Sequence, residues 1–137
     1  MGVLFGDEHV QRYRETDGEE GHTWQNGSTI LLLTTKGRKT GKETTTPLIY
    51  DFDDHNNPVI VASKGGAPEH PGWYLNLEKN PEVEVQIKGD RFSARARTTE
   101  GEEREQLWRK LNEMWPPYDE YQTKTTRQIP VVVLERV

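Results

Sequence analysis

The sequence predicts a mostly β fold of the α+β class, in which about six antiparallel strands form a barrel with two or three helices packed on it. Three observations predict this fold. Short β-rich apolar runs recur between turn residues. One pair of runs is separated by a two-residue turn, which only antiparallel strands allow. The regular alternation of strand and helix that a parallel sheet needs is absent from the sequence.

The N-terminal residues 1–27 are expected to form a helix and a loop within one domain that covers 1–137. The helix is expected at 7–14, with Asp7 as its N-cap. An acidic, glycine-containing segment follows, and its composition is typical of a loop. Residues 29–35 are a continuous apolar and β-branched run, which predicts a strand buried on both faces.

Two further strands are expected at residues 44–50 and 59–62. The first of them contains Pro47. Proline has no backbone N–H to donate to a neighbouring strand. We therefore expect Pro47 at a strand edge, at a bulge, or where something other than a strand approaches.

Residues 83–88 alternate strictly between apolar and polar, which predicts a strand with one wet face. Gly89 and Asp90 are expected to form the turn of a hairpin, with glycine at the position that needs a positive φ. The returning strand would keep its arginines in water. The side chains expected to face inward are Val83, Val85, Ile87, Phe92, Ala94 and Ala96.

The last part of the chain predicts a helix, a break and a final strand. Residues 99–102 have capping-box spacing and precede an amphipathic helix, which Pro116 and Pro117 should end. A loop or short helix follows, and 129–134 is expected to be a buried strand. The apolar positions of the helix are Leu107, Trp108, Leu111, Met114 and Trp115.

Composition excludes several classes of function. The net charge is −5 and the pI about 5.4, so nothing global attracts nucleic acid or an anionic membrane. The chain has no cysteine, and its four histidines are scattered, so we expect no metal site. No apolar run is long enough to span a membrane, which favours a cytoplasmic protein. No nucleophile elbow, Walker loop or Rossmann fingerprint is present, so an enzyme of this sequence would take its chemistry from a cofactor.

Two loops could hold a cofactor. The first, residues 36–42, carries four cations among glycines and a threonine, which suits a phosphate or carboxylate, although a solvated hairpin turn has a similar composition. The second, residues 62–68, carries one lysine and two adjacent glycines that would let the backbone approach a flat or charged ligand. Trp73 and Tyr74 follow in an expected short helix over 71–77, as core residues or as a cofactor wall.

A third cluster consists of Trp115, Tyr118 and Tyr121, around the proline break. These rings could stack on a flat ligand or fill the space between helix and barrel. A tyrosine hydroxyl within hydrogen-bond reach of a substrate can also act as a general acid.

The order of these motifs resembles that of the deazaflavin-dependent nitroreductases of actinobacteria. The similarity runs from about residue 30 to the C-terminus, roughly four-fifths of the chain. The segments that carry it are Leu33–Gly41, Thr46–Leu48, Val61–Gly66, His70–Leu77 and Trp115–Tyr121.

The resemblance implies a split β-barrel and a reductase that uses the reduced 8-hydroxy-5-deazaflavin coenzyme F-420. The hydride acceptor would be an electron-poor small molecule, such as a quinone, an α,β-unsaturated ester or lactone, or a nitro compound. An FMN-binding oxidase or reductase of the same fold and a non-catalytic deazaflavin carrier are the alternatives. A monomer or homodimer is expected, without stable membrane insertion but with peripheral membrane association left open.

The resemblance also implies a role for each motif. The phosphate and glutamate tail of the coenzyme would be held by Lys36, Arg38, Lys39 and Thr40. The ring and its linker would lie against Pro47, Leu48, Ala62, Ser63, Lys64, Gly65 and Gly66, with Trp73 nearby. The substrate pocket would be walled by Ile49, Trp115, Tyr118 and Tyr121. Tyr118 or Ser63 would orient or protonate the product. Some relatives have tyrosine at the position of Trp115 and an aromatic residue at that of Ile49, so these two positions bear on substrate shape.

Overall fold

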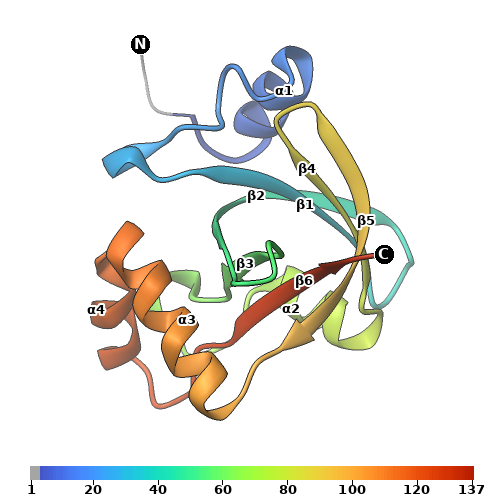
Figure 1. Cartoon of the computed structure of the whole chain (residues 1–137). Coiled ribbons are helices and arrows are strands. Elements are labelled where there is room, and N and C mark those ends of the chain that lie inside the picture. Colours follow the sequence, from blue (N-terminus) through green and yellow to red (C-terminus); the bar gives the residue numbers. More distant parts are fainter. Residues whose placement is uncertain (1–3) are drawn as a thin grey trace.

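The computed structural model describes residues 4–137, in which six antiparallel strands close into a barrel in the order β1-β2-β3-β6-β5-β4 (Figure 1). Four α-helices and two short 3-10 helices accompany the strands. In chain order the elements are α1 (Gly6–Thr16), η1 (Gln25–Gly27), β1 (Ile30–Lys36), β2 (Glu43–Phe52), β3 (Pro58–Val61), η2 (Lys64–Gly66), α2 (Gly72–Lys79), β4 (Glu82–Ile87), β5 (Asp90–Thr98), α3 (Gly101–Met114), α4 (Pro117–Thr123) and β6 (Val131–Arg136).

The mostly β, antiparallel barrel predicted from the sequence is confirmed. The expectation of two or three helices was too low, because the described residues form four α-helices. The segment for which a loop or a short helix was left open is α4, and Pro117 occupies its first turn, where a missing N–H costs no hydrogen bond.

The barrel is split along β2. The first seven residues of β2 pair with β1 alone, and pairing with β3 begins only at Tyr50. Pro47 lies opposite Leu32 of β1, and no second strand of residues 4–137 pairs with it on its other side. The prediction that Pro47 lies at a strand edge is therefore confirmed, and this unpaired edge is where the barrel opens.

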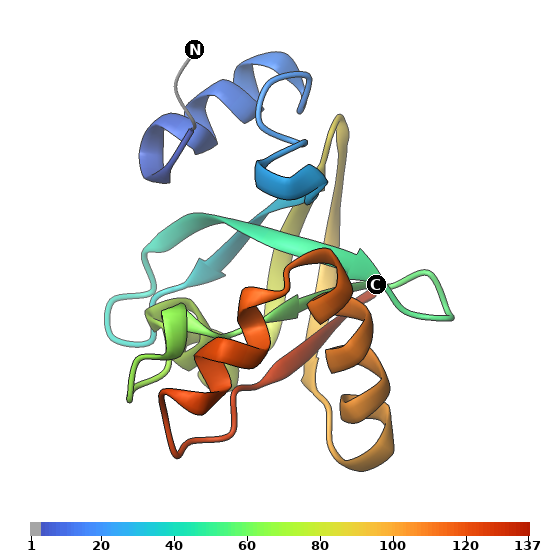
Figure 2. The same ribbon diagram turned by 90° about the vertical axis from the view of Figure 1, so that its left-hand side faces the viewer.

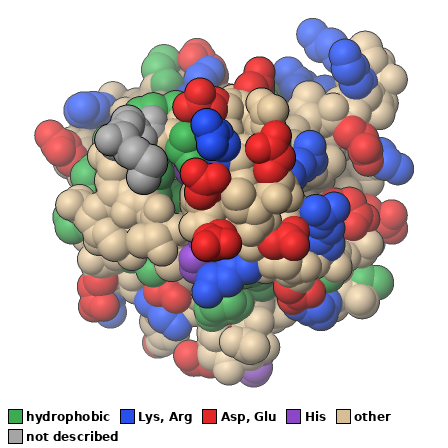
Figure 3. Space-filling view, turned by 90° about the horizontal axis from the view of Figure 1, so that it is seen from above, with side chains coloured by type: hydrophobic (Ala, Val, Ile, Leu, Met, Phe, Trp, Pro, Cys, Tyr) green, Lys and Arg blue, Asp and Glu red, His purple; other side chains and the backbone are tan. Residues whose placement is uncertain are grey.

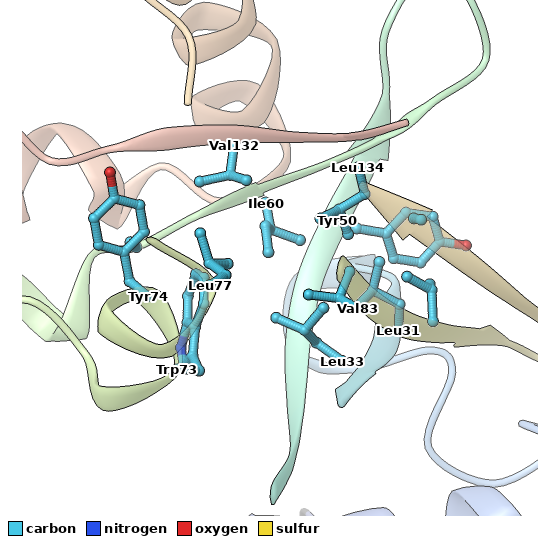
Figure 4. Packing of buried hydrophobic residues seen from close by; sticks show 13 residues of the cluster. Leu31, Leu33, Tyr50, Ile60, Trp73, Tyr74, Leu77, Val83, Val132 and Leu134 are labelled. Atoms are coloured by element: carbon cyan, nitrogen blue, oxygen red, sulfur yellow. The ribbon is translucent and has the colours of Figure 1, made fainter. Parts of the chain in front are cut away.

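The strands with continuous apolar runs bury side chains on both of their faces, inside the barrel and under the helices outside it. In β1, Leu31 and Leu33 point into the barrel, whereas Ile30 and Leu32 pack outside it under α1. All four side chains are at most 3% exposed, so a strand buried on both faces is confirmed. β3 and β6 follow the same rule, with their outer valines packed under α3 in a second cluster. Figure 4 shows the barrel interior, where side chains from all six strands and from α2 meet.

The helices lie on opposite sides of the barrel. In Figure 1, α1 is above the sheet and α3 and α4 are below it, and Figure 2 shows the latter two in the turned view. The face seen from above in Figure 3 carries interspersed acidic and basic side chains. No helix within residues 4–137 is both long and apolar enough to cross a bilayer.

Three local expectations are corrected. The β4–β5 turn is formed by Lys88 and Gly89, because Ile87 pairs with Asp90; Lys88 has a φ of +54°. α1 begins after Phe5 rather than at Asp7. Thr99 caps no helix, since its hydroxyl donates to the carbonyl of Val131 at 2.9 Å. In two of these cases a tertiary hydrogen bond replaces the expected local one. In the turn, the amide of Lys88 donates to the hydroxyl of Tyr13 at 2.7 Å, and at Thr99 the bond to Val131 takes the place of a helix cap.

Candidate active site

A cleft of about 330 Å³ lies at the unpaired edge of β2. This size is typical of pockets for small ligands. Five residues predicted for the site come together here from three segments: Pro47, Leu48, Ile49, Ser63 and Tyr118. Two larger hollows are lined mainly by polar and charged side chains and contain none of the predicted site residues.

Tyr118 lies in α4, just after the two prolines, and its side chain is 4% exposed. Its ring packs at 6.1 Å from Trp108 and at 6.2 Å from Tyr121, measured between centroids. The hydroxyl group makes no hydrogen bond to any residue between 4 and 137, although the residue lines the cleft. Burial raises the pKa of Tyr118 above its ordinary value, so the hydroxyl, which is a neutral donor at neutral pH in any case, stays protonated further into the alkaline range.

α4 is tied to α3 by polar contacts next to Tyr118. The indole Nε1 of Trp108 donates to Oδ1 of Asp119 at 2.6 Å. The side chain of Asn112 donates to Oδ2 of Asp119 at 2.8 Å and accepts from its amide at 3.1 Å. These bonds hold the first turn of α4, and with it the ring of Tyr118, at the wall of the cleft.

The loop that follows β3 carries Ser63 to the cleft and then turns under α4. Gly66 has a φ of +84°, and a Cβ placed there would lie 2.6 Å from the carbonyl oxygen of Tyr121. Only glycine fits such a contact. Lys64 also has a positive φ, +46°, which is strained for a residue with a side chain. The predicted cofactor loop is therefore held in an unusual conformation against the helix that presents Tyr118.

The basic loop predicted at residues 36–42 is the turn between β1 and β2. Its backbone closes through Gly37 and Lys42, and the hydroxyl of Thr40 accepts a hydrogen bond from the amide of Lys42 at 3.2 Å. Arg38 reaches the buried side chain of Asn76 in α2, with 2.9 Å between Nη1 and Oδ1. The three lysines of the turn are exposed.

None of the four cations of this turn forms an ion pair with a carboxylate of the described residues. The turn does not line the cleft, but β2 joins the two. Pro47 lies four residue steps after Glu43, the first residue of β2, which is a length of about 14 Å at roughly 3.4 Å per residue. A ligand in the cleft would have to extend along the hairpin by about this distance to reach the turn.

The predicted aromatic residues divide into two groups. Trp115 and Tyr121 join Tyr118 in one cluster, and the indole Nε1 of Trp115 lies 3.4 Å from the hydroxyl of Tyr121. Trp73 belongs to the barrel core instead, beside Tyr74 (Figure 4), which is the core alternative that the sequence left open. Its role next to a cofactor stays a prediction.

One wall of the cleft was missed by the sequence analysis. Phe5, Gly6 and His9 come from α1 and its N-terminal end, and Trp24 comes from the loop after α1. The ring of Trp24 stacks on that of Trp115 at 5.6 Å, so this wall joins the aromatic cluster. The aromatic residues Phe5 and Trp24 in the N-terminal segment were the available signals for this wall.

Arg127 was also missed. It lies between α4 and β6, and its guanidinium donates hydrogen bonds into the loop that follows β3. No group of three His, Asp or Glu side chains in the described part of the chain is arranged to hold a metal ion.

Comparisons with known proteins agree on one family. The model of a family described as F-420H(2)-dependent quinone reductase matches residues 6–136. An F-420H(2)-dependent quinone reductase of Mycobacterium tuberculosis is 43% identical, over 99% of this chain and 93% of its own length. A solved F-420-H2 dependent reductase is 48% identical, with a TM-score of 0.70 over 77% of this chain and 93% of that one. A structure described as a domain-swapped dimer is 43% identical, with a TM-score of 0.74 over 93% of this chain and 95% of that one.

Proposed function

The chain belongs to the F-420H(2)-dependent quinone reductase family and is thus an oxidoreductase with coenzyme F-420 as its cofactor, and we propose that the cleft at the split of the barrel is its active site. The acceptor that we propose is a quinone, with other electron-poor compounds, such as α,β-unsaturated esters or lactones and nitro compounds, as further candidates. The observation that carries the proposal is the unpartnered hydroxyl of Tyr118 at the cleft wall.

The residues present fit the coenzyme. A cleft lined mainly by apolar side chains suits a flat ring, and the edge of β2 at Pro47 leaves room for one. The four cations of the β1–β2 turn suit a phosphate and a tail of carboxylates. When it is bound, the reduced coenzyme supplies the hydride.

Binding is divided between two regions in this proposal. The β1–β2 turn binds the charged part of the coenzyme through Lys36, Arg38, Lys39 and Thr40. The ring is held by Pro47, Leu48 and the loop from Ala62 to Gly66. The acceptor would lie between the ring and the walls formed by Ile49, Trp115, Tyr118 and Tyr121. Of these, Ile49 and Tyr118 line the cleft itself, and Trp115 packs against Trp24, which also lines it.

Tyr118 orients and polarises the acceptor. Its neutral hydroxyl would donate a hydrogen bond to a quinone oxygen, where negative charge develops as the hydride arrives. The raised pKa makes Tyr118 a poor acid, so this proposal assigns it polarisation and takes the proton of the product from water. Ser63, which also lines the cleft, is the second candidate donor.

The test is anaerobic mixing of the protein and reduced coenzyme with a quinone, followed by absorbance. Oxidation of the coenzyme that saturates with quinone concentration is expected. Tight binding of the coenzyme without reduction of any quinone, enone or nitro acceptor would favour a carrier. Tighter binding of FMN than of the deazaflavin would favour the FMN alternative. A cytoplasmic location and a monomeric or homodimeric state stay predictions.

A further inference from the structure

Arg127 gathers one loop around its guanidinium group. Nε donates to the carbonyl oxygen of Ala67 at 2.8 Å, Nη1 to that of Ala62 at 3.2 Å, and Nη2 to that of Ser63 at 2.7 Å. Nη1 also lies 3.1 Å from Nδ1 of His70. All four partners belong to the segment that follows β3, 57 to 65 residues away in sequence.

The hydrogen-bond partners of Arg127 are neutral groups. Arg127 forms no ion pair with any carboxylate in residues 4–137, so its donors serve backbone carbonyls and one imidazole. A planar fork with five N–H donors can hold several carbonyls at fixed angles, which a lysine ammonium cannot do. The direct hydrogen bonds of Arg127 therefore orient peptide groups and do not pair it with a carboxylate.

The orientation of the carbonyls determines that of the amides. In a trans peptide the C=O and N–H bonds point in opposite directions, and the described chain has no cis peptide. The carbonyls of Ala62 and Ser63 face Arg127, so the amides of Ser63 and Lys64 point away from it. Neither amide donates to another residue of the described chain. Two adjacent backbone donors are thus left free beside the cleft that Ser63 lines.

We propose that Arg127 is a positioning residue that holds these two peptides so that the amides of Ser63 and Lys64 donate to acceptor atoms of the bound coenzyme. The inference rests on the proposed function, because it takes the coenzyme as the ligand. Donors that are oriented before binding cost no reorganisation when the ligand arrives. Without the guanidinium, the strained peptide at Lys64 is free to rotate and turn a carbonyl toward the ligand.

The first test measures coenzyme affinity by fluorescence titration for the wild type, Arg127→Lys and Arg127→Ala. We expect both variants to bind about tenfold more weakly or worse, since a point charge cannot replace the fork. The matched control is Arg136→Lys, at the other end of β6, where the arginine pairs with Asp90 and covers Phe92. Arg136→Lys should bind the coenzyme with the affinity of the wild type.

Chemical rescue separates positioning from stability. Added guanidinium ion should restore part of the coenzyme affinity of Arg127→Ala and leave that of the wild type unchanged. Melting temperatures are recorded for every variant. A folded Arg127→Lys or Arg127→Ala that binds the coenzyme as tightly as the wild type would overturn the proposal, as would absence of rescue in Arg127→Ala.

A second readout does not depend on the variants folding. Hydrogen exchange at the amides of Ser63 and Lys64 in the wild-type protein, measured by NMR, should slow when the coenzyme is added. Unchanged exchange at both amides with saturating coenzyme would overturn the role of these donors. A wild type that does not bind the coenzyme would overturn the proposed function as well, whereas normal binding with unaffected Arg127 variants would overturn this inference alone.

Discussion

Tyr13 and Tyr118 are two buried tyrosines with opposite surroundings. Tyr13 is fully buried on the inner face of α1, and its hydroxyl donates to the carbonyl of Ile30 at 2.9 Å and accepts from the amide of Lys88 at 2.7 Å. Tyr118 is 4% exposed, and its hydroxyl has no partner within residues 4–137. Burial raises the pKa of both groups. Hydrogen-bond satisfaction, rather than burial, separates the structural tyrosine from the candidate functional one.

The backbone is equally tight in both regions. Gly18, which follows α1, has a φ of +81°, and a Cβ there would lie 2.7 Å from Cα of Lys88. Gly66, beside the cleft, has a φ of +84° and a similarly close contact with α4. The two regions therefore differ in their free polar groups and not in their packing.

The largest effects are expected from alanine at these two glycines. Gly66→Ala and Gly18→Ala should each lower the free energy of unfolding by about 2–4 kcal/mol, through backbone strain and overlap. Only Gly66→Ala should also weaken coenzyme binding, by about tenfold or more, because it displaces the predicted cofactor loop. Urea unfolding and fluorescence titration provide the two measurements. Equal losses of affinity in the two folded variants would remove the distinction between the regions.

Tyr13→Phe should cost about 1–3 kcal/mol of stability, since it removes the hydrogen bonds of a buried hydroxyl and leaves the partly buried amide of Lys88 without this partner. Affinity for the coenzyme should stay at the wild-type value, because Tyr13 does not line the cleft. Denaturant unfolding at fixed pH checks the first statement and titration checks the second. If the free energy of unfolding of Tyr13→Phe equalled that of the wild type, the hydrogen bonds of this hydroxyl would not stabilise the fold.

Replacing both Arg38 and Lys39 with alanine should weaken coenzyme binding severalfold, and the loss should shrink at high salt because these side chains are exposed. The control is Arg95→Ala with Arg109→Ala, which removes the same charge from exposed positions of β5 and α3. The control variant should bind as the wild type does. The same loss in both variants would mean that net charge, and not the turn, attracts the coenzyme.

The smallest effect is expected for the stability of Tyr118→Phe. Its hydroxyl makes no hydrogen bond within residues 4–137, so the free energy of unfolding should change by less than about 0.5 kcal/mol. The comparison is with Tyr13→Phe under identical conditions. A large destabilisation would show that the hydroxyl of Tyr118 has a structural partner after all.

The sequence predicted those features that depend on local chemistry. The apolar run at Ile30–Leu33 indicated a strand buried on both faces, and Pro47 indicated an unpaired edge. The cluster around Tyr118 followed from its position after the proline break. Local pattern failed where a distant group decides the conformation. The hydroxyl of Tyr13 accepts the amide of Lys88, 75 residues away, and the hairpin turn lies one residue earlier than glycine alone indicated.

Arg127 and Trp24 show the same limit for the site. Both meet the predicted motifs only through the closed barrel, since the partners of Arg127 lie 57 to 65 residues away and Trp24 stacks on Trp115. Neither residue stands in a recognisable local pattern. For Trp73 the sequence left a core role and a cofactor contact open; the side chain lies in the barrel core, and its contact with the coenzyme stays a prediction.

The most direct test of the account compares Tyr13→Phe with Tyr118→Phe in single-turnover oxidation of the reduced coenzyme by a quinone. With coenzyme saturating, the wild type and Tyr13→Phe should react at the same rate. Tyr118→Phe should react about tenfold more slowly or worse, since the donor to the developing charge is lost. Equal rates for Tyr118→Phe and the wild type would contradict the assignment of the unpartnered hydroxyl to catalysis.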